Sequence, residues 1–405
     1  MIGSLVATGR RRTLAAGSQR ALIISAAVFA GWVIYANLFT ISDPLILGIL
    51  FVCGIYTIMF VAIGATPSAP DKVPFYDWVF TILSIACGIF FFVNAGVISD
   101  RISLLHPFTS TQLFFGSALL FLTLEATRRT TGLGLTGVVV LFLLYNQFGS
   151  YLPPPFGHGI SDYTYLLDIL VFTTDGVFGV PVQVVASYVF LFVMFGTFLS
   201  KAGGGEFFFN LASLVTGKSR GGPAKIAVIS SGLYGTMSGS PTSDVVATGS
   251  ITIPVMKRLG YSPRFAGAVE VAASTGGSAM PPIMGSAAFI LAEYTTVPYQ
   301  EVVLAALFPA LLYYLGVFLQ VHLRAVKDDL RPTDGKIPTV ADTFRTGWVF
   351  LIPIVGIVSA LMAGYSPTFT AGFGVLTAVA AASLLKVTRL SPWQTFGKPV
   401  PRESC

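Results

Sequence analysis

Long apolar runs alternate with short polar segments along almost the whole chain. Because about 20 apolar residues are needed to cross the hydrocarbon core of a bilayer, this pattern predicts membrane-spanning helices. The runs lie at 21–41, 44–64, 78–98, 108–125, 132–149, 181–200, 301–323, 347–363 and 367–385. Two further stretches, 223–257 and 262–293, are mostly apolar but are interrupted by Gly, Ser and Pro. The predicted fold class is an all-α polytopic membrane protein with about nine full spans, a re-entrant helical hairpin and a discontinuous helix.

Composition supports this prediction. The 405 residues are 54% hydrophobic and only 10% charged, and their mean hydropathy is +0.78. A soluble domain usually has about 25% charged residues, so the composition excludes an ordinary soluble enzyme. It also excludes a disordered chain, which would need low hydrophobicity and high net charge. The cysteines Cys53, Cys87 and Cys405 are too scattered for a disulfide framework.

The distribution of basic residues predicts the orientation in the membrane. Cytoplasmic loops collect Lys and Arg, and this also explains the net charge of +6. With a cytoplasmic basic tail at 1–20, alternating spans place every Lys and Arg inside except Arg101. This holds only if 223–257 enters and leaves on the same side. The run 21–41 lacks a cleavage site and is interpreted as a retained span rather than a signal peptide.

Residues 150–180 are predicted to form a periplasmic loop. The segment has no basic residue, contains Asp162, Asp168 and Asp175, and includes three consecutive prolines. Long loops without obvious structure are uncommon and often functional. Two interpretations stay open here, a solvated connector and a docking surface for an extracytoplasmic partner.

The first interrupted stretch, 223–257, predicts a helical hairpin with its tip inside the membrane. Unpaired backbone groups at that depth cost about 2–7 kcal/mol each and persist only where protein or water covers them. Asp244 follows the break, where it could cap the second half-helix or bind a cation, and both roles are compatible. The candidate residues at the tip are Ser238, Gly239, Ser240, Thr242, Ser243 and Asp244.

The second interrupted stretch, 262–293, predicts a helix broken near its middle. The cluster Ser274, Thr275, Gly276, Gly277, Ser278 cannot form a stiff helix, and Pro281 and Pro282 remove two amide donors. Glu270 precedes the break, and an acid within a span is either functional or hydrogen-bonded to another helix. The two breaks are separated by the short basic turn 257–264, so we expect them to face each other at similar depth.

The residues around the two breaks resemble those of a known protein family. The run SGLYGTMSGSPTSDVVATGSITIPVMKRLGYSPRFAGAVEVAASTGGSAMPPIMGSAAFILAEY resembles the large membrane subunit of TRAP (tripartite ATP-independent periplasmic) transporters. The chain is most similar to fused permeases, in which a small four-helix subunit precedes the large one and the solute receptor is of the TAXI type. The resemblance covers about 20 to 390. It implies small-subunit-like helices with a joining span at 21–149, a transport region at 181–390 and an atypical tail at 391–405.

The resemblance also implies a function. Such permeases are elevator-type transporters of the bacterial inner membrane, built from inverted repeats. They couple Na⁺ entry to uptake of a small organic anion, commonly a carboxylate, which a periplasmic receptor delivers. No organic cofactor or nucleic acid is implied. The family's first cation site corresponds here to Ser238, Gly239, Ser240 and Asp244 facing Ser274, Thr275, Gly276 and Gly277, with Ser240, Asp244 and Thr275 as Na⁺ ligands. One departure is Asp244, where the family more often has Asn.

A second departure leaves other interpretations open. The family's second hairpin and second broken helix have no counterpart in 347–363 or 367–385, so we expect a truncated product or a remainder encoded separately. The alternatives are a non-transporting remnant, an ion channel and an intramembrane enzyme. An enzyme would need an acid–base pair or metal ligands at depth, whereas His106, His158 and His322 lie at span ends or in loops. Glu125 and Arg129 are interpreted as an ordinary i,i+4 pair.

Overall fold

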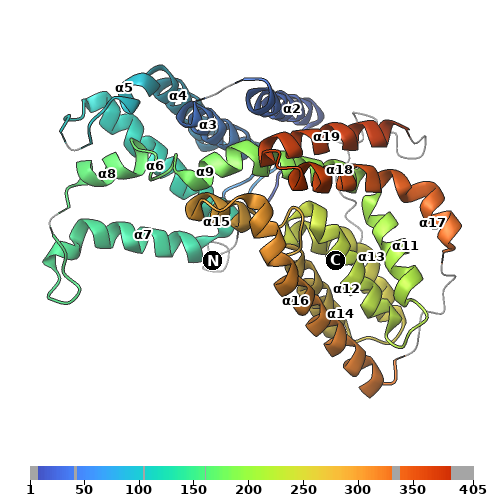
Figure 1. The fold of residues 1–405 in the computed structure, drawn as a ribbon. Coiled ribbons are helices and arrows are strands. Elements are labelled where there is room, and N and C mark those ends of the chain that lie inside the picture. Colours follow the sequence, from blue (N-terminus) through green and yellow to red (C-terminus); the bar gives the residue numbers. More distant parts are fainter. Residues whose placement is uncertain (1–7, 41–42, 104, 160, 331–337, 385–405) are drawn as a thin grey trace. The chain divides into compact units, whose positions relative to one another are not determined.

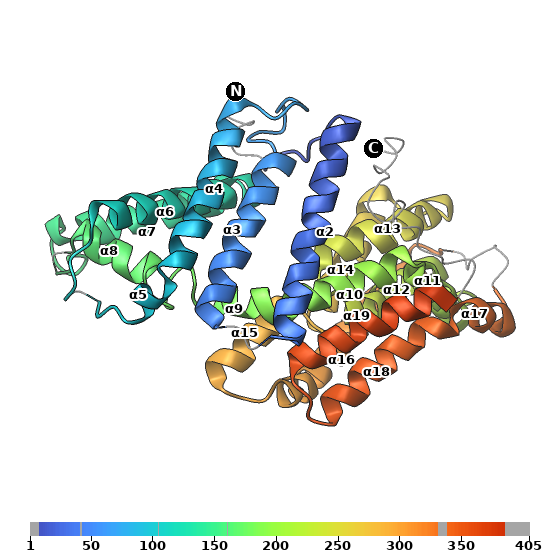
Figure 2. The same ribbon diagram turned by 90° about the horizontal axis from the view of Figure 1, so that it is seen from above.

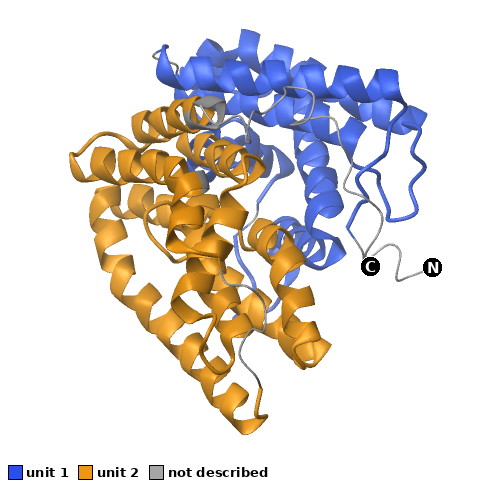
Figure 3. Cartoon of the chain, turned by 90° about the vertical axis from the view of Figure 1, so that its right-hand side faces the viewer, with its two compact units in different colours: residues 1–186, 396–405 blue, residues 187–395 orange. Residues whose placement is uncertain are grey.

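The computed structural model describes residues 8–40, 43–103, 105–159, 161–330 and 338–384, and in these residues it is helical without a strand. The chain divides into two compact units, which are described separately (Figures 1 and 3). Unit 1 comprises residues 1–186 together with 396–405, and unit 2 comprises residues 187–395. The predicted tail at 391–405 lies outside the described residues.

Unit 1 is a bundle in which the longer helices carry most of the predicted spans. Thr109 and Gln112 form a capping box at the start of one helix, and Asp43 accepts a hydrogen bond from the Leu45 amide at the start of another. The helices are α2 (Ala16–Leu38), α3 (Pro44–Ala62), α4 (Phe75–Val93), α5 (Ala95–Ser99), α6 (Ser110–Thr131), α7 (Leu133–Phe148), α8 (Tyr163–Val171) and α9 (Val180–Val184).

The core of unit 1 lies between α3, α4, α6 and α8. Helices α3 and α4 run side by side (Figure 2), and a Cβ on Gly88 would lie 3.0 Å from the Cβ of Cys53, so the glycine permits this close approach. Large side chains fill the space between the helices and are almost completely buried, among them Ile49, Phe60, Phe91, Leu119 and Leu167.

Helix α8 corrects one prediction. Residues 150–180 were expected to lack regular structure, but Tyr163–Val171 is helical. Its start is defined by Asp162, whose carboxylate accepts a hydrogen bond from the Tyr163 amide. The helix is short and buries Leu167 and Val171 in the core of unit 1. Tertiary packing therefore stabilises a helix that is too short to be stable by itself.

Unit 2 holds both interrupted stretches. Helices α12, α13 and α14 pack against one another, and α16 lies beside α12 and α14 (Figure 1). Their shared core contains small side chains such as Ala224, Ala227, Ala266 and Ala273, which allow close helix packing. The helices are α10 (Phe190–Lys201), α11 (Gly204–Thr216), α12 (Gly222–Ser238), α13 (Pro241–Arg258), α14 (Pro263–Gly277), α15 (Ser286–Thr295), α16 (Tyr299–Lys327), α17 (Val340–Gly347), α18 (Leu351–Met362) and α19 (Pro367–Leu384).

Six helical stretches in the described residues are long and apolar enough to cross a membrane. They are Ala16–Leu38, Pro44–Ala62, Phe75–Val93, Leu133–Tyr151, Val180–Lys201 and Tyr299–Lys327. The predicted spans 108–125, 347–363 and 367–385 are not among them. Helix α6 carries Glu125, Arg128 and Arg129 near its end, and the other two are shorter apolar helices. A total of nine spans stays a prediction.

Candidate functional site

Both predicted helix breaks are present in unit 2. Helix α12 ends at Ser238 and α13 begins at Pro241, so only Gly239 and Ser240 separate them. Gly239 has a φ of 58°, which glycine adopts without strain, and a Cβ here would collide with the Met284 carbonyl oxygen. Helix α14 continues through residues 274–277, so the prediction that this cluster breaks the helix was wrong. The irregular stretch begins at Ser278 and ends at α15, which starts at Ser286.

The two breaks face each other, as predicted. The Ile283 amide donates a 3.3 Å hydrogen bond to the Thr236 carbonyl. A Cβ on Gly277 would lie 2.7 Å from the Gly235 Cα, so only glycine permits this approach of α12 and α14. The carboxyl-terminal ends of these two helices therefore converge, and the partial negative charges of both helix dipoles meet there.

Asp244 lies at this convergence and is completely buried, at 0% exposure. Its Oδ1 accepts a hydrogen bond from the Ser238 hydroxyl. Its Oδ2 is buried without a hydrogen-bond partner among the described residues and would lie 2.9 Å from a Cβ on Gly277. Asp244 does not cap α13, because Ser240 is the N-cap residue and Asp244 belongs to the first helical turn. The capping interpretation was therefore wrong.

Glu270 is also completely buried, and four hydroxyl groups converge on its carboxylate. Ser231 of α12 donates a 2.9 Å hydrogen bond, and Ser274 of α14 approaches to 3.4 Å. Thr248 and Thr252 of α13 donate to the two carboxylate oxygens. Glu270 therefore joins both arms of the hairpin to the broken helix, as expected for a hydrogen bond between helices.

The remaining predicted residues lie around the tip without reaching Asp244. Ser240 is half-buried, and its hydroxyl is 3.3 Å from that of Thr242. Thr242 and Ser243 are exposed. Thr275 is exposed as well, and its hydroxyl donates to the Val271 carbonyl of its own helix. The structure thus brings Ser238, Asp244 and the two glycines of the α12–α14 contact together, but not these four hydroxyl groups.

Sequence reasoning missed the polar face of α13. Asp244, Thr248 and Thr252 are spaced four residues apart and lie on one helix face, each at most 3% exposed. Polar residues at this spacing in a mostly apolar segment indicate a polar helix face, so the sequence could have predicted it. The Ser231 hydroxyl of α12 lies 2.9 Å from the Thr248 hydroxyl and adds a fourth buried polar group to this face.

Tyrosines of α16 cover the backbone near the second break. The Tyr313 and Tyr314 hydroxyls each donate a 2.8 Å hydrogen bond, to the carbonyls of Ala272 and Ala273 respectively. The Tyr299 hydroxyl is shared between the carbonyls of Pro282 and Ile283. Irregular backbone in an apolar environment needs such donors, so α16 stabilises the broken conformation.

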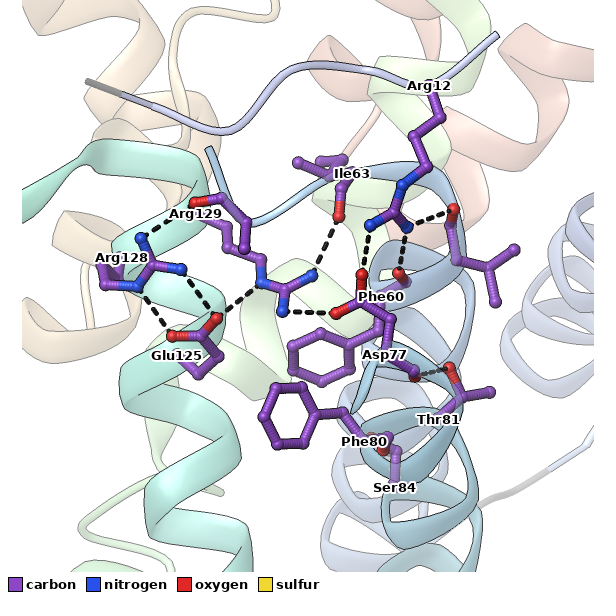
Figure 4. A network of polar contacts seen from close by, with 12 residues as sticks. Arg12, Phe60, Ile63, Asp77, Phe80, Thr81, Ser84, Glu125, Arg128 and Arg129 are labelled. Carbon is purple, nitrogen blue, oxygen red and sulfur yellow. Dashed lines mark hydrogen bonds and ion pairs between the residues drawn. The ribbon is translucent and has the colours of Figure 1, made fainter. Parts of the chain in front are cut away.

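Unit 1 contains a different polar cluster, centred on Asp77 (Figure 4). Arg129 donates to Oδ1 at 2.6 Å, and Arg12 donates to Oδ2. Glu125 accepts from Arg129 and Arg128, each at 2.7 Å. Glu125 and Arg129 are thus not merely an exposed i,i+4 pair, because the Arg129 side chain is 0% exposed.

The same cluster corrects the predicted basic tail. Residues 1–7 lie outside the described part, but Arg12 is buried and donates to the Phe60 and Val61 carbonyls. Helix α2 already begins at Ala16. The predicted tail at 1–20 therefore includes a packed segment. It is held by the contact between Arg12 and Asp77, which are 65 positions apart in the sequence, and the hydropathy pattern does not reveal this contact.

The fold and the two facing breaks define a class of protein. In the described residues, helices long enough to cross a membrane occur together with two interrupted helical stretches that face each other, a combination typical of membrane transporters. A family model described as the tripartite ATP-independent periplasmic transporter, DctM component, matches residues 118–395. The chain therefore belongs to the DctM family of TRAP transporter large permeases.

Several curated relatives are similar to the chain. The C4-dicarboxylate TRAP transporter large permease protein DctM of Pseudomonas aeruginosa is 27% identical over 235 residues, which cover 56% of this chain and 55% of the relative. DctM of Vibrio cholerae is 29% identical over 44% of the chain and 39% of the relative. The ectoine/5-hydroxyectoine permease UehC of Ruegeria pomeroyi is 30% identical over 42% and 40%. The chain spans about half the length of the curated relatives it matches.

Proposed function

We propose that the chain is the permease component of a TRAP transporter that couples Na⁺ entry to uptake of a small organic anion. The observation that carries this proposal is the free Oδ2 of Asp244, buried where the ends of α12 and α14 converge. A buried carboxylate oxygen without a partner is costly, and a bound cation removes that cost. Family membership supports transport, and the names of the relatives support a carboxylate or a similar small solute.

The geometry favours a monovalent hard cation at this position. Asp244 supplies the charge, and the carboxyl-terminal ends of two helices supply carbonyl oxygens and partial negative charge. Transporters bind Na⁺ with unwound backbone carbonyls of this kind. Among the described residues, Ser238 supplies the hydroxyl group that hydrogen-bonds to the Asp244 carboxylate. The hydroxyls of Thr275 and Ser240 do not bond to Asp244 in this conformation, and their role as Na⁺ ligands stays a prediction.

The same turn offers a place for the anion. The amino-terminal ends of α13 and α15 follow directly after the two breaks, and a Cβ on Gly285 would lie 3.5 Å from the Gly239 carbonyl oxygen. Helix amino termini attract negative charge. A carboxylate at these two ends and a cation at the α12 and α14 ends would be bound at adjacent positions, which is the arrangement that coupled transport needs.

Direct Na⁺ binding to the purified chain tests this proposal without requiring transport. We expect Asp244→Ala to weaken ²²Na⁺ binding by about tenfold or more, because a charged ligand is lost. Ser250→Ala on the same helix is the matched control, since its exposed hydroxyl bonds only within α13. Gly277→Ala should also weaken binding, because its Cβ would meet Asp244, whereas Gly267→Ala on α14 has open space. Unchanged Na⁺ affinity in Asp244→Ala would refute the site.

The organisation of the complete transporter is also part of the proposal. Helices α2–α5 precede residue 118, where the family match begins, and we propose that 21–149 is a fused small-subunit-like part with a joining span. The region 181–390 is proposed to carry one repeat of an elevator-type transport domain. The proposed partner is a periplasmic solute receptor of the TAXI type. The division into these domains stays a prediction.

The orientation belongs to this proposal too. We propose a bacterial inner membrane location, with a cytoplasmic N-terminus and the segment 150–180 on the periplasmic side, available for docking of the receptor. The charge asymmetry of the sequence supports this orientation. Aromatic side chains on the segment are strongly exposed, for example Tyr151 at 84% and Phe156 at 67%, as a docking surface would require.

A further inference from the structure

Two consecutive tyrosines near the middle of α16 both reach α14. The rings of Tyr313 and Tyr314 are 5.7 Å apart and lie at an angle of 86° to each other. Their hydroxyls donate to the carbonyls of Ala272 and Ala273, which lie about one helical turn before the end of α14 at Gly277. Two neighbouring residues of one helix therefore hold two neighbouring residues of another, and this fixes the position and the rotation of the α14 end relative to α16.

Each of these rings occupies a place where the facing helix has no side chain. A Cβ on Gly276 of α14 would collide with the Cε1 of Tyr313 and would lie 3.0 Å from the Cζ of Tyr314. A Cβ on Gly232 of α12 would lie 3.0 Å from the Cε1 of Tyr314. The Tyr314 ring therefore packs against both α12 and α14. Because protein interiors are close-packed, this ring sets how closely the two helices approach each other here.

A backbone contact between α12 and α14 lies next to this ring. Gly235 is about one turn beyond the glycine of α12 that the ring touches, and Gly277 directly follows the glycine of α14. A Cβ on Gly277 would lie 2.7 Å from the Gly235 Cα and 2.9 Å from the Asp244 Oδ2, and a Cβ on Gly235 would lie 3.3 Å from that oxygen. The carboxylate oxygen without a hydrogen-bond partner among the described residues therefore lies against the helix contact that the tyrosine ring adjoins.

We propose that Tyr313 and Tyr314 are positioning residues for the cation site at Asp244, an inference that rests on the proposed Na⁺ site. Their hydroxyls are bonded to carbonyls of α14, so they act through the helices and not as ligands of the ion. The rings hold α12 and α14 at the separation that places the Asp244 Oδ2 between the two helix ends. A binding site needs its ligands held to within about 0.5 Å by the residues packed behind them. A tyrosine suits this role because it combines a rigid ring with a hydroxyl group.

A double-mutant cycle in Na⁺ affinity distinguishes a positioning role from a role in fold stability alone. A residue that only stabilises the fold lowers the unfolding midpoint when it is changed and leaves the Na⁺ affinity of the folded chain as it was. Binding of ²²Na⁺ and thermal unfolding in Na⁺-free buffer are therefore measured for the full chain, for Gly276→Ala, for Tyr313→Leu and for the double variant. Gly276→Ala places a methyl group against the Tyr313 ring, and Tyr313→Leu removes the ring atoms with which it collides. Gly316→Ala on α16 is the control, because nothing lies within 4 Å of its Cβ.

We expect Gly276→Ala to weaken Na⁺ binding by about tenfold or more, because loss of a contact that orients the ligands of a metal typically costs that much. In the chain that carries Tyr313→Leu, the same change should weaken binding by less than about twofold, because the collision is gone. Gly316→Ala should leave the affinity unchanged. Tyr314→Phe retains the ring and loses one hydrogen bond, so it should weaken Na⁺ binding by about threefold. This variant gives the decision if Gly276→Ala does not fold.

Two results would overturn the positioning role. One is an equal loss of Na⁺ affinity for Gly276→Ala with and without the Tyr313 ring, and the other is unchanged Na⁺ affinity in both Gly276→Ala and Tyr314→Phe. Asp244→Ala, measured in the same assay, shows which proposal has failed. If it weakens Na⁺ binding while the tyrosine and glycine variants do not, the cation site stands and only the positioning role is wrong. If Asp244→Ala leaves Na⁺ binding unchanged, the cation site is wrong and the positioning role is wrong with it.

Discussion

Removal of the Asp77 carboxylate is expected to destabilise unit 1 strongly. Asp77 is 0% exposed and binds two arginines whose side chains are also almost fully buried. Asp77→Ala leaves the Arg12 guanidinium without a carboxylate partner, whereas Arg129 keeps Glu125. Breaking a buried ion pair by removing one partner typically costs 3–5 kcal/mol, because the remaining charge is uncompensated. Arg12 retains the Phe60 and Val61 carbonyls as acceptors, which places the expected loss near the lower end, at about 3 kcal/mol.

The chain offers a matched control only two residues from Arg12. Arg10 pairs with Asp71 at 3.3 Å, but both side chains are more than 40% exposed. Arg10→Met should therefore cost only about 0–1 kcal/mol, and that small effect should vanish in high salt. The loss in Asp77→Ala should persist in high salt, because the buried pairs are shielded from counterions.

Thermal unfolding of the purified chain in detergent measures both losses. For a unit of this size 1 kcal/mol corresponds to roughly 2–4 °C, so Asp77→Ala should lower the midpoint of unit 1 by about 6–12 °C. A double-mutant cycle with Arg12→Met should show coupling of about 1 kcal/mol or more. Equal midpoints for Asp77→Ala and Arg10→Met would refute the interpretation of the cluster as a buried structural element.

Two further predictions concern the segment after α7. Both ring nitrogens of His158 face backbone carbonyl oxygens, that of Tyr145 at 2.9 Å and that of Gly159 at 2.7 Å. Only the protonated imidazolium ring can donate both hydrogen bonds, so these bonds raise the pKa of His158. The contacts should thus be complete below the ordinary pKa of about 6.5 and be lost as the pH rises through the raised value. Hydrogen exchange at 145–159 should show this loss, and His158→Asn should abolish its pH dependence. The predicted orientation can be tested with a membrane-impermeant thiol reagent applied from the periplasmic side to a chain lacking Cys405. The reagent should label Tyr151→Cys but not Arg258→Cys, and strong labelling of Arg258→Cys would contradict the re-entrant hairpin.

The helix breaks could be predicted from the sequence because they depend on local chemistry. Gly239 and Pro241 interrupt a helix through backbone geometry alone, and the observed break lies inside the predicted one. That the breaks face each other also followed from the short connection between them. Buried polar residues were found when they stood in an apolar run, as Asp244 and Glu270 do.

Pairings over long sequence distances could not be predicted in this way. Asp77 begins an apolar run and looks like an ordinary helix-terminal acid, and nothing local connects it to Arg12. The same holds for Tyr313 and Tyr314, whose hydroxyls bond carbonyls 41 residues away. Helix α8 was missed because a nine-residue helix carries little periodic signal and owes its stability to the core of unit 1.

Charge compensation separates the structural polar clusters of this chain from the candidate binding sites. Around Asp77 and Glu125 every carboxylate oxygen has an arginine partner, so no carboxylate of this cluster needs a cation. Asp244 differs, because it is buried with only the Ser238 hydroxyl as a partner of its carboxylate and with no opposite charge among the described residues. Desolvation of an unpaired ion costs several kcal/mol even after relaxation, and that cost is offset whenever a counterion binds. A cation bound at the free oxygen of Asp244 would offset this cost, which is why the proposed Na⁺ site lies at Asp244 and not at Asp77.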